Sequence, residues 1–174
     1  MNGLEYVSEK TKYAYSLFKQ IKFFKKARAI VVKDNELLVI KVLYNNGDTH
    51  YLLPGGGVDE GESVKQATIR ETLEEYNVNV VPVKYLGKQY YSVNMEINDE
   101  KFKSNRVEYF YVCKYISSAT DTPFGIEGEF EKSDRNYIKT TLTLEELKKI
   151  NHKDLNGINQ QNINKLIKFM EESQ

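Results

Sequence analysis

The sequence has little cysteine, no tryptophan and no excess of charge of either sign. Cys113 is the single cysteine among 174 residues, so an intramolecular disulfide is excluded. Because it lies in the run VEYFYVCKYI, which predicts a strand, we expect a buried thiol rather than a nucleophile, in a reducing, cytoplasmic environment. Lys and Arg total 25 and so do Asp and Glu, which excludes a global charge attraction to nucleic acid or an anionic membrane.

Long apolar runs and linker-like composition are also missing. No apolar stretch approaches the roughly 18 residues that a membrane span needs, and the opening MNGLEYVSEK lacks the layout of a secretory signal. There is no repeat, low-complexity stretch or Pro/Ser-rich linker. A chain of 174 residues can bury a sizeable core, so we expect one domain preceded by a short arm.

The arm, residues 1–26, is predicted to be an amphipathic basic helix. Between Tyr13 and Phe24 the apolar residues recur at helical spacing, and lysines occupy the other side. The apolar residues are Ala14, Leu17, Phe18, Ile21 and Phe24. Two interpretations stay open: the helix packs on its own domain or on a second copy in a homodimer, or its basic face contacts RNA, DNA or lipid.

Residues 27–174 are predicted to form a β-rich body with a helical tail. The segment ARAIVVKDNELLVIKVLY predicts a hairpin, HYLL a short strand, and NVVPVKYLGKQYYSV and FKSNRVEYFYVCKYI two later strands. Thr143 and Glu146 form a capping box that opens the helix LEELKKI. A final helix is indicated by the apolar stripe of Ile163, Leu166, Ile167 and Met170.

The segment GGGVDEGESVKQATIRETLEEYNV, residues 55–78, concentrates glycine and acidic residues. Ser63 and Gln66 have the form of a capping box, so a helix should start after Glu62 and run to Tyr76. One face of this helix should carry Glu71, Glu74 and Glu75. The opposite face should carry Ile69, Thr72, Leu73 and Tyr76. The carboxylates repel one another, and a hard cation such as Mg²⁺ or Mn²⁺ would offset their charge.

Three consecutive glycines lie shortly before this helix. Gly55, Gly56 and Gly57 allow the backbone to approach a ligand closely and to adopt positive φ. Glycines before a helix that carries metal-binding carboxylates suit a phosphate-bearing substrate.

This spacing resembles the Nudix box, in which glycine, glutamate and arginine occupy fixed positions. The matching residues are Gly56, Glu62, Arg70, Glu71, Glu74, Glu75 and Val78. Thr72 and Asn77 depart from the pattern, which has an apolar residue and a glycine there. Thr72 can bond its hydroxyl back to the preceding turn, and Asn is the next-best residue after glycine for a left-handed helix end.

The resemblance implies an α/β/α sandwich around a mixed β-sheet and a divalent-metal-dependent hydrolase. Its substrate would be a nucleoside diphosphate linked to another group. In the family the residues matching Glu74 and Glu75 hold the metal, and the one matching Glu71 binds metal or acts as general base. Arg70 is expected to orient these carboxylates through bidentate contacts, including one to Glu62.

Other polar and aromatic residues have alternative interpretations. Family members often add an acidic residue from a later loop, and among Glu127, Glu129 and Glu131 we expect Glu129 to join the metal site. His50 is expected to pack within its short strand, and His152 to be exposed. Four tyrosines could stack a nucleobase or form cross-strand pairs: Tyr90, Tyr91, Tyr109 and Tyr111.

The choice among Nudix substrates depends only on sequence signatures that this chain lacks. The proline typical of ADP-ribose subfamilies is absent near Ser92, and neither the NADH-type array SQPWPFP nor a coenzyme A signature is present. We therefore expect cleavage of an NTP or dNTP to the monophosphate and pyrophosphate. The alternatives are an ADP-ribose or NDP-sugar pyrophosphatase, an RNA 5′-end pyrophosphohydrolase, and a non-catalytic Nudix-fold binding module.

Overall fold

The structure is a computed structural model, and it describes residues 24–97, 100–119, 135–150, 155–156 and 158–172. Most of the predicted arm helix therefore lies outside the described residues. The last residues of the arm, from Phe24 on, are described, and they form the start of β1, Phe24–Lys33. Phe24 was expected in the helix and is instead aligned with Arg106 in a parallel strand pair, so tertiary pairing overrides the local helical pattern.

The predicted hairpin is confirmed as β1 and β2, Glu36–Tyr44. Lys33 pairs with Glu36, which leaves a two-residue turn. Asp34 and Asn35 in that turn have φ values of 52° and 64°. Asn and Asp adopt this left-handed conformation more readily than other residues with a side chain, so these two residues close the hairpin.

The strands form one mixed sheet. The remaining strands are β3 (Thr49–Leu52), β4 (Val78–Ile97), β5 (Glu100–Ser118), β6 (Arg135–Thr143) and β7 (Leu155–Asn156). The order is β4-β5-β1-β2-β3-β7, with β6 also paired to β2. The β1–β5 and β3–β7 pairs are parallel, and the others are antiparallel. β3, β4 and β5 correspond to predicted strands, whereas β6, with sequence RNYIKTTLT, was not predicted.

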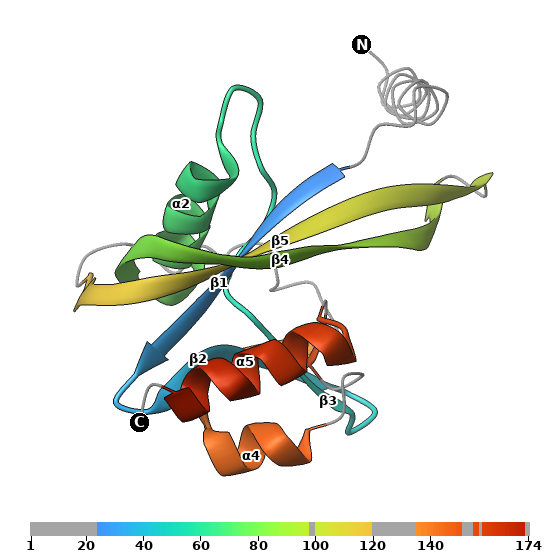
Figure 1. The fold of residues 1–174 in the computed structure, drawn as a ribbon. Coiled ribbons are helices and arrows are strands. Elements are labelled where there is room, and N and C mark those ends of the chain that lie inside the picture. The colour runs from blue at the N-terminus through green and yellow to red at the C-terminus, as the bar shows by residue number, and fades with distance from the viewer. Residues whose placement is uncertain (1–23, 98–99, 120–134, 151–154, 157, 173–174) are drawn as a thin grey trace.

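Helices lie on both sides of this sheet, as Figure 1 shows. α2, Val64–Tyr76, lies on one side, and α4, Leu144–Lys149, lies with α5, Gln160–Glu172, on the other. Both predicted capping boxes are present, at Ser63 and Thr143. The predicted α/β/α arrangement around a mixed sheet is confirmed. In the described part of the chain, no helix is long and apolar enough to cross a membrane.

The two faces of the sheet have different cores. The larger core joins the sheet to α4 and α5 and includes Phe110, Leu147 and Leu166. The smaller one contains Ala29, Val31, Val78, Val80 and Cys113 and packs against Tyr76 of α2. Burial raises the pKa of the Cys113 thiol to about 12, which agrees with the predicted inert core residue.

The side of α2 that packs on the sheet consists of small residues. Ala67, Thr68 and Thr72 are fully buried, and the Thr72 hydroxyl donates to the Thr68 carbonyl at 2.6 Å. The prediction for Thr72 is therefore confirmed. The prediction for Ile69 is wrong, because its side chain is 39% exposed. Small side chains bring the helix axis close to β1, and this rotates the acidic residues partly toward the sheet.

Candidate active site

The ends of α2 determine where its carboxylates lie. Ser63 Oγ accepts the Gln66 N–H at 3.3 Å, and Gln66 Oε1 accepts the Ser63 N–H at 2.9 Å. At the other end Asn77 has φ 56° and ψ 43°, and its N–H donates to the Leu73 carbonyl. The predicted left-handed helix end at Asn77 is confirmed. The helix is thus fixed at both ends by its own sequence.

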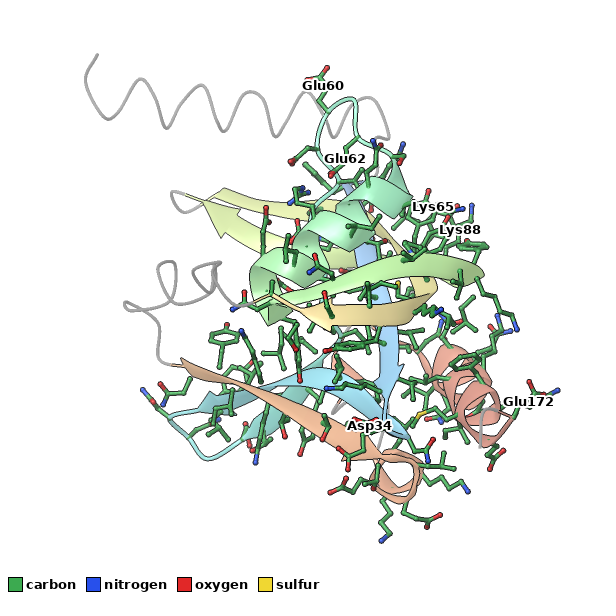
Figure 2. The ribbon with its side chains drawn as sticks, turned by 90° about the vertical axis from the view of Figure 1, so that its left-hand side faces the viewer. Asp34, Glu60, Glu62, Lys65, Lys88 and Glu172 are labelled. Carbon is green, nitrogen blue, oxygen red and sulfur yellow. The ribbon has the colours of Figure 1, made fainter. Side chains whose placement is uncertain are left out.

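Arg70, in the middle of α2, is the centre of an acidic cluster. Its Nε and Nη2 donate to the two carboxylate oxygens of Glu62 at 3.0 and 2.8 Å, as a bidentate pair. Nη1 donates to Glu71 at 2.9 Å and to Glu74 at 3.1 Å, and Nη2 also donates to the Gly57 carbonyl at 2.9 Å. In Figure 2, Glu62 lies beside the first turn of α2, and Glu60 is at the outer tip of the preceding loop. The hydrogen bonds from Arg70 lower the pKa of Glu62.

Glu75, and Glu71 as well, lie against the glycine segment, residues 55–57. Glu75 Oε2 accepts the Gly55 N–H at 2.7 Å. A Cβ at residue 56 would overlap the Glu71 carboxyl group, so Gly56 leaves the space that Glu71 occupies. Burial raises the pKa of both groups, that of Glu75 to about 7, and the charge of Glu71 adds to the effect on Glu75. The carboxyl groups of Glu71 and Glu75 are therefore partly removed from water, which disfavours their charged forms.

The glycine segment runs along the edge of β1. The N–H of Ala27 donates to the Gly56 carbonyl at 2.9 Å, and that of Ala29 to the Pro54 carbonyl at 2.8 Å. Gly55 has φ +139°, and a Cβ there would overlap the carbonyl of Ala27. Glycine at positions 55 and 56 is thus required by packing alone. Gly57 has open space around it, so among the three it has room for a ligand.

A buried ion pair that the sequence did not indicate lies beneath this segment. Arg28 of β1 donates to one carboxylate oxygen of Glu108 of β5 from Nε at 3.2 Å and from Nη2 at 3.1 Å. The side chains are 11% and 0% exposed. The available signal was a single charged residue within each of two apolar strands, ARAIVV and VEYFYV.

Cations lie next to the carboxylates. Burial and the charges of Arg28 and Arg106 lower the pKa of Lys26, whereas Glu108 and Glu75 raise it. Lys26 forms a β-bridge with Gly57, so it is directly beside the glycine segment. The site therefore combines an acidic side on α2 with a basic side on β1 and β5.

The donor set fits a hard divalent cation. Glu71 and Glu75 are half-buried carboxylates, and a bound cation would offset the burial that raises their pKa values. In the described ranges no three acidic, His or Cys side chains are already gathered as ligands. Arg70 holds Glu71 and Glu74, and the Gly55 N–H holds Glu75. Glu129, the predicted additional ligand, lies outside the described residues, as do Glu127 and Glu131.

His50, Tyr91 and Tyr111, which were also candidates, have structural partners. His50 is half-buried in β3, and its ring lies edge-on to Tyr44 with centroids 5.3 Å apart. Tyr111 is aligned with Tyr85 across the β4–β5 ladder, and their rings are also 5.3 Å apart. The Tyr91 hydroxyl donates to Glu108 at 3.1 Å. His152 lies outside the described residues.

The sequence model of one protein family, described as NUDIX domain, matches residues 23–161. The chain belongs to the Nudix family. The predicted family is therefore confirmed, and the match covers β1, the glycine segment, α2 and the strands that carry Arg28 and Glu108.

Curated relatives resemble only part of this Nudix chain. An RNA pyrophosphohydrolase of Wolbachia sp. subsp. Drosophila simulans (strain wRi) is 41% identical over 54 residues, which are 30% of this chain and 33% of the relative. One of Wolbachia pipientis wMel is 42% identical over 52 residues, 29% of this chain and 32% of the relative. The chain thus spans about a third of the length of the curated relatives it matches.

Solved structures share the fold over most of the chain. A Nudix hydrolase from Nitrosomonas europaea has a TM-score of 0.59 and 15% identity, covering 87% of this chain and 90% of that one. A UDP-X diphosphatase has a TM-score of 0.55 and 15% identity, covering 95% of this chain and 72% of that one. At these identities the likeness establishes the fold.

Proposed function

We propose that this Nudix chain is a divalent-metal-dependent hydrolase that cleaves a phosphoanhydride bond of a nucleotide, with an NTP or dNTP as the substrate class. Water would add across the α–β linkage, and the products would be the monophosphate and pyrophosphate. The observation that carries the proposal is the pairing of half-buried carboxylates, Glu71 and Glu75, with the basic side that includes Lys26, across a glycine segment.

Each group has a role in this proposal. Glu71, Glu74 and Glu75 would hold Mg²⁺ or Mn²⁺, which neutralises phosphate oxygens and activates water. Glu71 would serve as ligand or general base, and Glu129 would be a further ligand. Arg70, held by Glu62, orients the carboxylates. Lys26 is positioned to neutralise phosphate oxygens that reach Gly57, since a polyphosphate repels any nucleophile until its charge is offset.

A second candidate is an RNA 5′-end pyrophosphohydrolase. The observation in its favour is the name of the curated relatives, which match about a third of their own length. RNA binding would make activity fall steeply with salt, because phosphate contacts release counterions. A non-catalytic binding module is less well supported, since every acidic residue of the motif is present and lies at the site.

The test is a parallel assay of NTPs, dNTPs, ADP-ribose, NDP-sugars and a 5′-triphosphate RNA with Mg²⁺ or Mn²⁺. We expect nucleoside triphosphates to have the highest kcat/KM and to yield pyrophosphate, with Glu75→Gln as the inactive control. A preference of ten-fold or more for ADP-ribose, a sugar nucleotide or the RNA would overturn the substrate assignment. The cytoplasmic location and the homodimer stay predictions, and sedimentation of the purified chain would test the latter.

A further inference from the structure

We propose that Arg28 and Glu108 form a buried positioning pair that fixes the backbone of Gly55 and, through it, the carboxylate of Glu75. Neither residue belongs to the motif on which the proposed function depends. The inference rests on that proposed function, because it assigns to Glu75 a role that requires exact placement.

Arg28 connects two separate parts of the site. One edge of its guanidinium donates to Glu108 through Nε and Nη2. The other edge, Nη1, donates to the carbonyl of Leu53 at 3.2 Å and to the carbonyl of Gly55. A planar group with donors on both edges can serve both partners at once, which a lysine ammonium on a flexible chain cannot do with the same geometry.

Glu108 is itself held from β4. Its Oε1 accepts the Tyr91 hydroxyl at 3.1 Å, and its Oε2 accepts Gln89 Nε2 at 3.3 Å. Gln89 in turn accepts the N–H of Asn159, just before α5, at 2.9 Å. The carboxylate is therefore anchored to the sheet and to the start of a helix, and it cannot follow Arg28 if that side chain moves.

Gly55 transmits this constraint to the acidic side. Its carbonyl accepts from Arg28, and its N–H donates to Glu75 at 2.7 Å. Its φ of +139° and the close approach of Ala27 leave the residue little freedom to turn. Because Gly55 has little freedom to change φ and ψ, a displacement of its carbonyl would carry its Cα and N–H along and lengthen the contact with Glu75. The buried pair therefore constrains the position of a proposed metal ligand on another element.

The experiment must separate positioning from plain stability. The variants are Arg28→Lys, Glu108→Gln, Arg28→Met and the double variant Arg28→Met/Glu108→Gln, with Lys114→Met, an exposed residue of β5, as the control. The double variant matters because removing both partners of a buried ion pair can leave stability nearly unchanged, whereas removing one cannot.

Each variant is measured in three ways: kcat and KM with the best nucleotide, Mn²⁺ binding without nucleotide, and the NMR shift of the Gly55 amide proton. We expect Arg28→Lys and the double variant to lower kcat by about ten-fold or more with KM changed less than about three-fold, because positioning acts on the transition state. Mn²⁺ binding should weaken, and the Gly55 amide resonance should move upfield as its hydrogen bond lengthens.

A double variant with wild-type kcat and Mn²⁺ affinity would overturn the proposal whether or not its melting temperature changes, because the pair would then contribute at most to stability. If Arg28→Met does not fold, Arg28→Lys and Glu108→Gln give the same comparison. Should the wild-type chain hydrolyse no nucleotide, the proposed function fails, and Mn²⁺ binding together with the Gly55 resonance still decides whether the pair positions Glu75.

Discussion

Two arginine clusters lie on either side of the glycine segment, and they differ in exposure and charge balance. Arg70 is 29% exposed and contacts three glutamates, Glu62, Glu71 and Glu74, so its cluster keeps an excess of negative charge. Arg28 is 11% exposed and shares its charge with one fully buried glutamate, Glu108. The first cluster can take up a further cation, whereas the second is already neutral and can only hold the backbone in place.

The comparison predicts losses of stability of different size when each arginine is removed. We expect Arg28→Met to lower the free energy of unfolding by about 3–5 kcal/mol, because it leaves a buried carboxylate without its counter-ion. Arg70→Met should lower it by less, about 1 kcal/mol, because Arg70 is 29% and Glu74 52% exposed and water can partly replace the lost contacts. Urea unfolding of the metal-free chains measures both values, and equal losses would mean that exposure does not distinguish the clusters.

The acidic side should dominate turnover. Glu74→Gln or Glu75→Gln is expected to lower kcat by about 10²-fold or more while the fold stays intact, since each change removes a proposed metal ligand but little volume. Steady-state assays at saturating Mg²⁺, with circular dichroism as the check on folding, measure this. A wild-type kcat in either variant would contradict the proposal that α2 supplies the metal ligands.

Glu75 and Glu62 should make contributions to stability that change with pH in opposite directions. The pKa of Glu75 is raised from 4.5 to about 7, so the folded metal-free chain keeps a proton that the unfolded chain releases. Stability should therefore fall as pH rises from about 4.5 to 7, by about 2 kcal/mol after allowance for solvent screening.

The matched comparison uses Glu75→Gln and Glu62→Gln. Glu75→Gln should abolish the fall in stability between about pH 4.5 and pH 7. Glu62 acts in the other direction: Arg70 lowers its pKa, so Glu62 stabilises the fold at higher pH, and this contribution is lost as pH falls through the lowered pKa. Glu62→Gln should remove that contribution. Thermal melting between about pH 2 and pH 8, where about 1 kcal/mol shifts the melting temperature by a few degrees, measures both effects. A flat profile for the wild-type chain would contradict the burial of Glu75.

The smallest expected effect is at the end of α2. Asn77→Val should destabilise the chain by about 1 kcal/mol, because a β-branched residue tolerates the observed φ of 56° poorly. Asn77→Gly should be neutral or slightly stabilising, since glycine adopts this conformation without strain. Denaturant midpoints of the two variants test this, and a milder effect of valine than of glycine would show that the helix end relaxes.

The Arg70 cluster could be predicted from the sequence because its partners are near in the chain. Glu74 is one helical turn after Arg70, and Glu62 and Gly57 lie only 8 and 13 residues before it, in the loop that leads into α2. The partners of Arg28 are 25, 27 and 80 residues away, so only the sheet order shows them. Ile69 was placed wrongly for a related reason: α2 packs through small residues, and hydrophobicity does not indicate that face.

β1, the strand along which the glycine segment runs, also offers a built-in reporter. Successive N–H groups of a strand point to opposite sides, and those of Ala27 and Ala29 donate to Gly56 and Pro54 while the intervening ones point toward β5. Opening of the glycine segment would therefore speed deuterium exchange at alternate amides of β1 only. Hydrogen exchange along this one strand, with no substrate or metal present, would give the free energy with which the site opens, separately from the free energy of unfolding the sheet.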